Sequence, residues 1–188
     1  WQVTVVDDDG ATAQTTATID VLPINDPPIA GSTSYSMNED STITLTDAQL
    51  LANSSDIEGA VSIDEVSYTG DNGIFVDNGD GTYTFAPNQN WNGDVELDVT
   101  VADADGATDQ TTANIDVLPI NDPPVAGHTS YHVQEDGRIF ISSDQLVSQS
   151  TDVEGDFLVA QNLSTTSEHI EVNDLGYGTW EIVPDANY

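Results

Sequence analysis

The sequence predicts an all-β protein made of tandem β-sandwich domains of about 96 residues each. Two observations lead to this prediction: a long internal repeat and a strand-like alternation of apolar and polar residues. Residues 3–31 recur as residues 99–127, and 24 of the 29 positions are identical. A period of this length corresponds to a whole domain and is too long for a solenoid unit.

The repeat also predicts how the chain is divided into domains. The match continues past residue 127, and after one inserted residue Pro87 recurs as Pro184. We expect residues 1–22 to be the last two strands of a preceding domain, 23–119 a complete domain, and 120–188 a following domain without its last two strands. The chain is therefore expected to be a segment of a longer array of such domains.

The first part of the complete repeat alternates short apolar segments with polar turns. Ile43 and Leu45 alternate with threonines, as in a strand with one buried face. Thr46 is a favourable helix N-cap, so a single helical turn is expected directly after it. The elements expected here are strands at 33–37, 41–46 and 61–68 and the helical turn at 47–51.

The second part of the complete repeat contains four further strands. Asn78-Gly79 and Asp105-Gly106 have the sequences of tight hairpin turns. The expected strands lie at 74–77, 82–86, 95–102 and 109–118. Their alternating apolar residues are expected to form the core, from Val95, Leu97, Val99, Val101, Ile115 and Val117. Seven short strands of this kind predict an immunoglobulin-like sandwich.

The composition is strongly acidic. The chain has 34 Asp plus Glu residues against one Lys or Arg, which gives a formal net charge of −33. This charge excludes nucleic acid as a partner and repels anionic lipid, because both are negatively charged. No apolar stretch approaches the roughly 18 residues of a membrane span, and neither cysteine nor lysine is present for covalent crosslinks. Bound divalent cations are the expected source of extra stability.

Acidic loops are expected at both ends of the sandwich. If the strands run alternately up and down, the loops after the second and sixth strands return to the incoming linker. These loops carry Asp56 with Glu58 and Asp103 with Asp105. The opposite end receives Glu39, Asn90, Asn92 and Asp94. Carboxylate and amide oxygens are the ligands that Ca²⁺ prefers, so calcium is expected where consecutive domains meet.

The order of these motifs resembles that of cadherin repeats. It is more closely similar to the bacterial cadherin-like tandem repeats of large RTX-type surface adhesins. The motifs that carry this resemblance are Glu39, Asp56-x-Glu58, VTVADADG at 99–106 and VLPINDPP at 117–124. The resemblance implies calcium at the linkers between domains. The implied ligands are Asp7, Asn25, Asp26, Glu39, Asp56, Glu58, Asp103, Asn121, Asp122, Glu135, Asp152 and Glu154, to which the loop placement adds Asp105.

Several positions depart from the family pattern. Pro119 stands where the pattern has a linker aspartate, and the second member of each Asp-x-Asp pair is a glutamate, Glu58 or Glu154. The loop before the sixth strand is rich in asparagine where the family has an acidic cluster. The resemblance therefore implies fewer calcium ions at each junction than animal cadherins bind.

The acidic domain ends and the resemblance together predict a structural protein without enzymatic activity. We expect a calcium-stiffened extender of a secreted bacterial cell-surface adhesin, which supports adhesion and biofilm formation indirectly by projecting a binding domain. Its partners would be neighbouring repeats of the same chain or of like chains. Two alternatives stay open: a module that binds polysaccharide or a cell-surface protein, and a subunit of an extracellular filament in which residues 1–22 complete the last repeat of a neighbour.

Other chemical motifs carry less weight. The chain has no GxSxG sequence and no Ser, His and Asp set that recurs between repeats. His128 and His132 share a strand face, but their counterparts in the preceding repeat are serines, which argues against a transition-metal site. Trp91 and Tyr188 occupy matching positions, and we expect them in the core or at its end; a sugar-stacking platform is the alternative.

Overall fold

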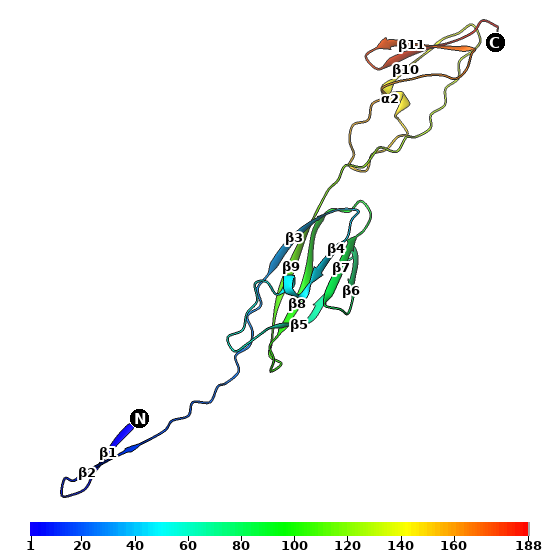
Figure 1. The fold of residues 1–188 in the computed structure, drawn as a ribbon. Coiled ribbons are helices and arrows are strands. Elements are labelled where there is room, and N and C mark those ends of the chain that lie inside the picture. Colours follow the sequence, from blue (N-terminus) through cyan, green and yellow to red (C-terminus); the bar gives the residue numbers. More distant parts are fainter. Residues whose placement is uncertain (188) are drawn as a thin grey trace. The chain divides into compact units, whose positions relative to one another are not determined.

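A computed structural model describes residues 1–187 of the chain (Figure 1). The chain divides into two compact units, Trp1–Val117 and Leu118–Tyr188. Strands predominate, and the helices within residues 1–187 are single turns of four residues. None of these helices is long and apolar enough to cross a membrane. The predicted all-β class is confirmed.

Residues 33–118 form a seven-stranded β-sandwich, which confirms the predicted architecture (Figure 1). One sheet has the strand order β3-β9-β8-β5 and the other has the order β4-β7-β6. The strands are β3 (Thr33–Asn38), β4 (Ile43–Thr46), β5 (Ser62–Ser67), β6 (Gly73–Asp77), β7 (Thr82–Pro87), β8 (Gly93–Ala102) and β9 (Thr108–Leu118). Each strand lies within two residues of its predicted position, because the alternation of apolar residues directly reflects the two faces of a strand.

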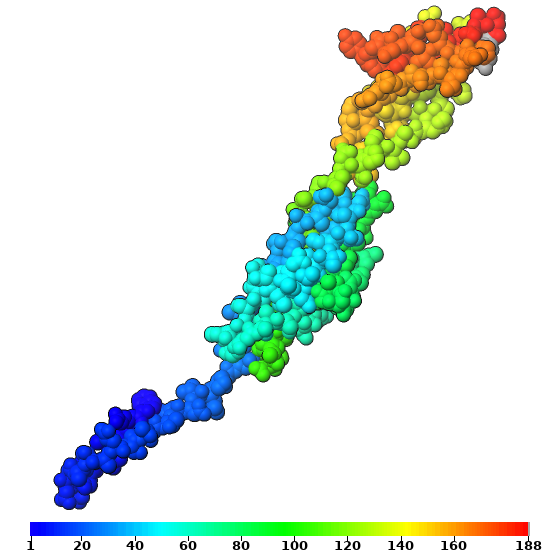
Figure 2. Space-filling view, viewed as in Figure 1, coloured from blue at the N-terminus to red at the C-terminus, as the bar shows by residue number. Residues whose placement is uncertain are grey.

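The hydrophobic core lies between these two sheets. Phe85 and Leu45 from the three-stranded sheet and Leu97 from the four-stranded sheet are each 1% exposed. The ring of Phe85 also packs edge-on against Tyr68, with ring centroids 5.2 Å apart. The six residues predicted for the core are all buried: Val95, Leu97, Val99, Val101, Ile115 and Val117. In Figure 2, the sandwich is the cyan and green surface around this core.

The helical turn α1 (Asp47–Leu50) follows β4 and confirms the turn predicted there. It begins with a capping box, in which the Gln49 N–H donates to the Thr46 hydroxyl at 3.3 Å and the Thr46 N–H donates to the Gln49 side chain at 3.0 Å. The Tyr83 hydroxyl donates to Asp47 at 3.0 Å, and burial together with this bond raises the pKa of Tyr83 to about 12. Leu50 is buried, so α1 anchors the loop that follows it.

The segment after the first linker is fastened to this loop. Ile29 and Ser55 form a two-way backbone bridge, with N···O distances of 2.8 and 3.0 Å. The Gly31 N–H donates to the Ser54 hydroxyl at 3.1 Å, and a β-carbon at Gly31 would collide with the Asn53 carbonyl. Glycine is therefore required here. The same contacts recur in unit 2 with Val125, Thr151, Gly127, Ser150 and Gln149.

Unit 2 contains one sheet with the strand order β10-β12-β11. Its elements are β10 (Ile139–Ser142), α2 (Ser143–Leu146), β11 (Ile170–Gly176) and β12 (Thr179–Pro184), the counterparts of β4, α1, β6 and β7. Residues 127–134 and 157–167, the counterparts of the β3 and β5 regions, form no strand. In unit 1, β3 pairs with β9 and β5 with β8, whereas residues 118–187 contain no strand that takes the role of β8 or β9.

The chain begins with a hairpin of β1 (Gln2–Val6) and β2 (Thr12–Thr16), which pair antiparallel. Every residue of both strands is exposed. Residues 17–28 follow the hairpin without forming a strand. The division into a partial, a complete and a second partial repeat stays a prediction.

We expect Leu97→Ala to lower the free energy of unfolding of the sandwich by about 2–5 kcal/mol, because it leaves a cavity between the sheets. Val76→Ala, at a position 46% exposed, is the control and should change it by less than about 1 kcal/mol. Chemical denaturation, followed by the amide NMR signals of β8, measures both changes. Equal effects at the two positions would contradict the assignment of the core.

Candidate metal centre

Five of the predicted ligands line one small cavity in unit 1, which we call the linker cavity. It has a volume of about 80 Å³ and is lined by Asn25, Asp56, Glu58, Asp103 and Asp105, together with Gly59, Ala60 and Ala104. The linker, the loop after α1 and the loop after β8 therefore meet, as an up-and-down order of strands predicts. A cavity of this volume has room for a single ion together with very little water.

Asp103 is the most firmly held of these side chains and is 8% exposed. Its Oδ1 accepts the N–H groups of Asp105 at 3.0 Å and Ala107 at 2.8 Å. Its Oδ2 accepts the side-chain amide of Asn25 at 2.7 Å, which ties the linker to the loop. The hydrogen bond from Asn25 is the main cause that holds the pKa of Asp103 below its ordinary value, and backbone N–H groups add to it. Asp103 therefore stays ionised.

Asp56 supplies a free oxygen to the same region. Its Oδ1 accepts the N–H groups of Glu58 and Gly59, each at 2.8 Å, in a turn that fixes the carboxylate. Its Oδ2 is buried and has no hydrogen-bond partner among the residues that the structure describes. A buried carboxylate oxygen without a donor is costly, and a cation would remove that cost. The donor set of the linker cavity thus fits a metal ion that prefers oxygen.

Unit 2 repeats part of this arrangement. The Asp122 N–H donates to Glu154 Oε2 at 3.3 Å, so the second linker also contacts the loop after the helical turn. Asp152 Oδ1 accepts the N–H groups of Glu154 and Asp156, each at 3.1 Å. Asp122 Oδ2 is buried and, within residues 1–187, has no hydrogen-bond partner. Asn121 donates its side-chain amide to the Asp122 carbonyl at 3.0 Å. Asp122, Asp152 and Glu154 therefore gather around the second linker.

The opposite end of the sandwich carries a second group of predicted residues. Glu39 is 3% exposed, and the side-chain amide of Asn92 lies 3.5 Å from its Oε2. Beside it, Asp40 Oδ1 accepts the N–H of Asn90 at 3.0 Å. These contacts bring together the loops after β3 and β7, as the strand order predicts. Glu135, the counterpart of Glu39, is exposed in unit 2.

Some predicted ligands lie outside these clusters. Asp7 is in the turn of the exposed hairpin, where its Oδ1 accepts the Ala11 N–H at 2.7 Å. Asp26 is exposed on the first linker. Neither Asp7, Asp26 nor Glu135 lines the linker cavity. Their assignment as ligands stays a prediction.

Sequence reasoning missed Asp109, which also fastens the linker. Its Oδ2 accepts the Ala30 N–H at 2.9 Å. This bond is the main cause that lowers the pKa of Asp109, with the Gln110 N–H as the second. The sequence contained one indication of this role, a difference between the repeats: residue 13 of the first hairpin is alanine, whereas its counterpart is Asp109.

The acidic side chains line the linker cavity without meeting at one point. Within residues 1–187, no three Asp, Glu, His or Cys side chains are close enough together to form a metal site as they stand. Binding an ion in the linker cavity therefore requires its acidic side chains to move closer together. The available donors are carboxylate and amide oxygens, which suit Ca²⁺, whereas zinc sites are built mainly from cysteine and histidine.

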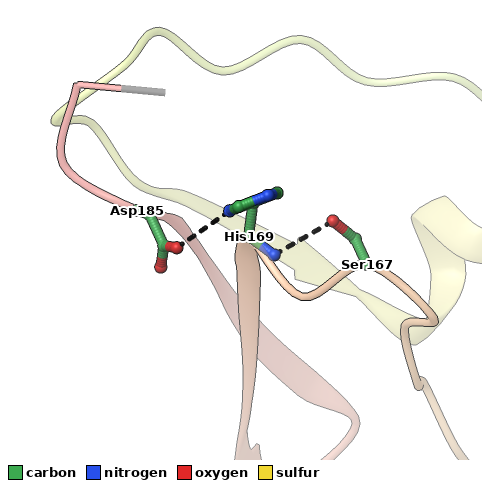
Figure 3. A network of polar contacts seen from close by, with 3 residues as sticks. All are labelled: Ser167, His169 and Asp185. Carbon is green, nitrogen blue, oxygen red and sulfur yellow. Dashed lines mark hydrogen bonds and ion pairs between the residues drawn. The ribbon is translucent and has the colours of Figure 1, made fainter.

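The remaining candidate residues include His169 and two tryptophans. His169 Nδ1 lies 3.2 Å from Asp185, and the backbone N–H of His169 donates to the Ser167 hydroxyl at 3.2 Å (Figure 3). Ser167 thus accepts the backbone N–H of His169, and Asp185 contacts the ring. Trp91 packs against the core of the sandwich, and Trp180 is 2% exposed. Tyr188, predicted to match Trp91, lies outside the described residues.

The chain is similar to a known domain family over most of its length. The sequence profile of the family described as “Cadherin-like domain” matches residues 24–118 and 120–188. No curated protein matches the chain.

Several solved structures are similar at low identity. The extracellular cadherin domains 1–5 of protocadherin gamma B2 are 16% identical, with a TM-score of 0.42, over 98% of this chain and 37% of that one. The endo-fucoidan hydrolase MfFcnA9 of glycoside hydrolase family 107 is 16% identical, with a TM-score of 0.34, over 85% and 30%. The human desmocollin-1 ectodomain is 11% identical, with a TM-score of 0.34, over 95% and 34%. The chain thus spans 30–37% of these solved chains.

We expect Asn25→Ala to raise the pKa of Asp103 towards the ordinary aspartate value of about 3.9. A carboxylate whose pKa is lower in the folded state stabilises the fold above the unfolded-state pKa, and this stability is lost as the pH falls through the folded-state pKa. The variant should therefore lose part of this acid-sensitive stability. A carbon-13 NMR titration of the Asp103 carboxyl measures the shift, with Asn78→Ala as the control. An unchanged pKa in Asn25→Ala would contradict the assigned hydrogen bond.

Proposed function

Because the chain belongs to the cadherin-like domain family, we propose that its repeats form a calcium-stiffened extender in a larger bacterial cell-surface adhesin. Cadherin-like domains are typically extracellular, adhesion-related modules, generally without enzymatic activity. They typically bind calcium, and they commonly associate with neighbouring repeats or like chains. As an extender, this segment would hold a binding domain away from the cell and would not bind the target of that domain.

The observation that carries the proposal is the linker cavity. Its lining comes from the linker and from two loops that are far apart in the sequence. Asn25 and Asp103 are 78 residues apart and are already joined by a hydrogen bond. The buried Oδ2 of Asp56 supplies an oxygen that needs a partner. Asp56, Glu58, Asp103, Asp105 and the Asn25 amide oxygen would hold the ion.

The charge of the chain supports a cation at this position. With a net charge of −33, carboxylates that share a cavity repel one another and destabilise the fold. A bound Ca²⁺ supplies two positive charges where this repulsion is concentrated. Extracellular calcium modules bind with dissociation constants on the order of 10⁻⁴–10⁻³ M, so the site would be filled outside the cell and sensitive to chelators.

Stiffness would follow from the position of the site. The linkers contain Asp-Pro-Pro, whose prolines have a fixed φ and disfavour the helical region in the preceding residue. An ion that binds Asn25 together with Asp56 and Asp103 would fix the start of this segment to the sandwich. In unit 2, Asp122 with Asp152 and Glu154 would act in the same way on the second linker. Each linker would then have few conformations left to sample.

The polysaccharide-binding alternative has less support. The sugar-stacking platform given as the alternative would use Trp91, whose side chain packs against the core, although other aromatic residues such as Phe157 and Tyr177 are exposed. The near identity of residues 3–31 and 99–127 also favours a spacer, because a dedicated binding site would make one copy differ from the other.

We expect the pair Asp56→Asn and Glu58→Gln to weaken calcium binding at the linker cavity by at least about tenfold, because it removes two charges and preserves size. The same replacement at Asp152 and Glu154 should weaken binding at the second linker. Isothermal titration with Ca²⁺ measures both. At about 100-fold excess, bound calcium stabilises the folded state by roughly 2.7 kcal/mol, and this increment should disappear with the site.

The control pair is Asp77→Asn and Asp80→Asn. These carboxylates accept hydrogen bonds from backbone N–H groups in the turn between β6 and β7. They do not line the linker cavity. Calcium binding should be unchanged in this variant. Equal losses in the control and in the site variants would mean that calcium binds diffusely to an acidic surface, and the extender proposal would then lack a defined site.

We expect chelation of calcium to loosen the linkers before it unfolds the sandwich. The proposed ligands lie in loops and linkers, whereas the core is formed by buried apolar residues of the strands. Small-angle scattering should show an increase in flexibility on chelation, while the circular dichroism of the strands stays constant. A scattering profile that is the same with and without calcium would contradict the proposal.

A further inference from the structure

Strand β6 is an open edge of the sandwich at residues 33–118. In its sheet the strand order is β4-β7-β6, so among residues 1–187 β6 has a hydrogen-bonded neighbour on one side only. All seven strands of this sandwich are described, so the edge is a property of the seven-stranded fold itself. An unpaired edge carries N–H and C=O groups that can pair with a further strand.

The register with β7 determines which backbone groups of β6 face outwards. The Asn78 N–H donates to the Thr82 carbonyl at 3.0 Å, directly after the last residue pair of the two strands. Hydrogen-bonded and non-hydrogen-bonded pairs alternate along an antiparallel ladder, so the even-numbered residues of β6 bond to β7. The residues whose N–H and C=O groups point away from β7 are therefore Gly73, Phe75 and Asp77.

The side chains of β6 also favour contact with another strand. Ile74 is 67% exposed and Val76 is 46% exposed. They lie on either side of Phe75, which packs against the core, so both point to the outer face of the sheet. The outer side of this edge is thus apolar.

The outer face of this sheet is also free of charge. Its outward-facing residues are Thr44, Thr46, Ile74, Val76, Thr82, Thr84 and Ala86. By contrast, the outer face of the four-stranded sheet carries Asp94, Glu96 and Asp98 on β8 alone. Because the chain has a net charge of −33, the face at β6 is the one of these two at which like copies repel each other less.

The corresponding strand of unit 2 differs at this edge. Glu171 of β11 pairs with Val183 at the position where Ile74 of β6 pairs with Ala86. The side chain of Glu171 is exposed. A charge on an edge strand is a common protection against pairing with another chain. Strand β6 has an aliphatic side chain at this position and lacks that protection.

We propose that two copies of this chain associate through β6 across a two-fold axis at Phe75 and form one continuous sheet. Antiparallel pairing about this axis places Ile74 of one copy opposite Val76 of the other, and Asp77 opposite Gly73. The apolar side chains therefore contact one another, and no carboxylate of β6 faces another. The order of strands in the joined sheet is β4-β7-β6-β6-β7-β4.

A second copy is the occupant that the charges and the register favour. A basic partner would be attracted to the acidic loops and to the outer face of the four-stranded sheet, and not to a face without carboxylates. A copy of the chain offers the same unpaired edge, and this edge is complementary to itself about Phe75. The contact joins chains that run in opposite directions. It uses no residue of the linker cavity, so it goes beyond the calcium proposal and does not depend on it.

Sedimentation velocity of the 188-residue chain tests the proposal. The chain should form reversible dimers, and association should strengthen as salt is added, because salt screens the repulsion between two acidic copies. Ile74→Glu, which introduces the residue type that unit 2 has at this position, should weaken association at least about tenfold. The matched control is Ser36→Glu, which adds the same charge at an exposed position of another edge strand, β3, and should associate as the original chain does.

Cysteine crosslinking gives the second measurement, since the chain has no cysteine of its own. Positions 74 and 76 of two copies would form a non-hydrogen-bonded pair, whose short Cα separation suits a disulfide. A mixture of the Ile74→Cys chain and the Val76→Cys chain should therefore crosslink at least about tenfold faster than either chain alone. Equal rates would contradict the register.

The remaining outcomes are equally decisive. A chain that is monomeric at all concentrations, or association that persists unchanged in Ile74→Glu, would overturn the proposal. The variant Asp56→Asn with Glu58→Gln should dimerise as the original chain does. A failure of the calcium proposal and a failure of the β6 contact are therefore distinguishable.

Discussion

The pairing of β8 with β9 over ten residues is the contact on which the rest of the sandwich depends. The two strands supply buried residues for half of the core, and they form the sheet edges along which β3 and β5 pair. In unit 2, β10, β12 and β11 also pair with one another, whereas the segments that correspond to β3 and β5 form no strand within residues 118–187.

The acidic loops depend on the same framework. Asp103 directly follows β8, and Asp56 follows a helical turn that is anchored by Leu50. Backbone N–H groups hold the Oδ1 of each carboxylate, while Oδ2 of Asp103 accepts the Asn25 amide and Oδ2 of Asp56 is buried without a donor among the described residues. Holding charged groups in this way before an ion arrives reduces the entropy that binding must overcome. The framework therefore determines the geometry of the loops, and their charge favours a cation.

The strands of the sandwich at residues 33–118 were predictable because local alternation and turn residues such as Asn78-Gly79 determine them. The meeting of Asn25 with Asp56 and Asp103 followed from strand order, which places the loops before any side chain is considered. The buried state of Asp56 Oδ2 was not predictable, since it depends on packing around a turn. The role of Asp109 was also missed, because a single acidic residue at the start of a strand is indistinguishable from a solvated one.

The fastening of the linker at Ile29 and Gly31 also determines how the domain responds to force. The chain enters the sandwich beside Ser55, passes through β3 to the end that holds Glu39, and leaves that end through β9. β3 and β9 are neighbours and run in the same direction, so tension on the chain loads the hydrogen bonds between them in shear. Bonds loaded in shear must break together, whereas bonds at a peeled edge break one at a time. The sandwich is therefore built to resist pulling from its two ends.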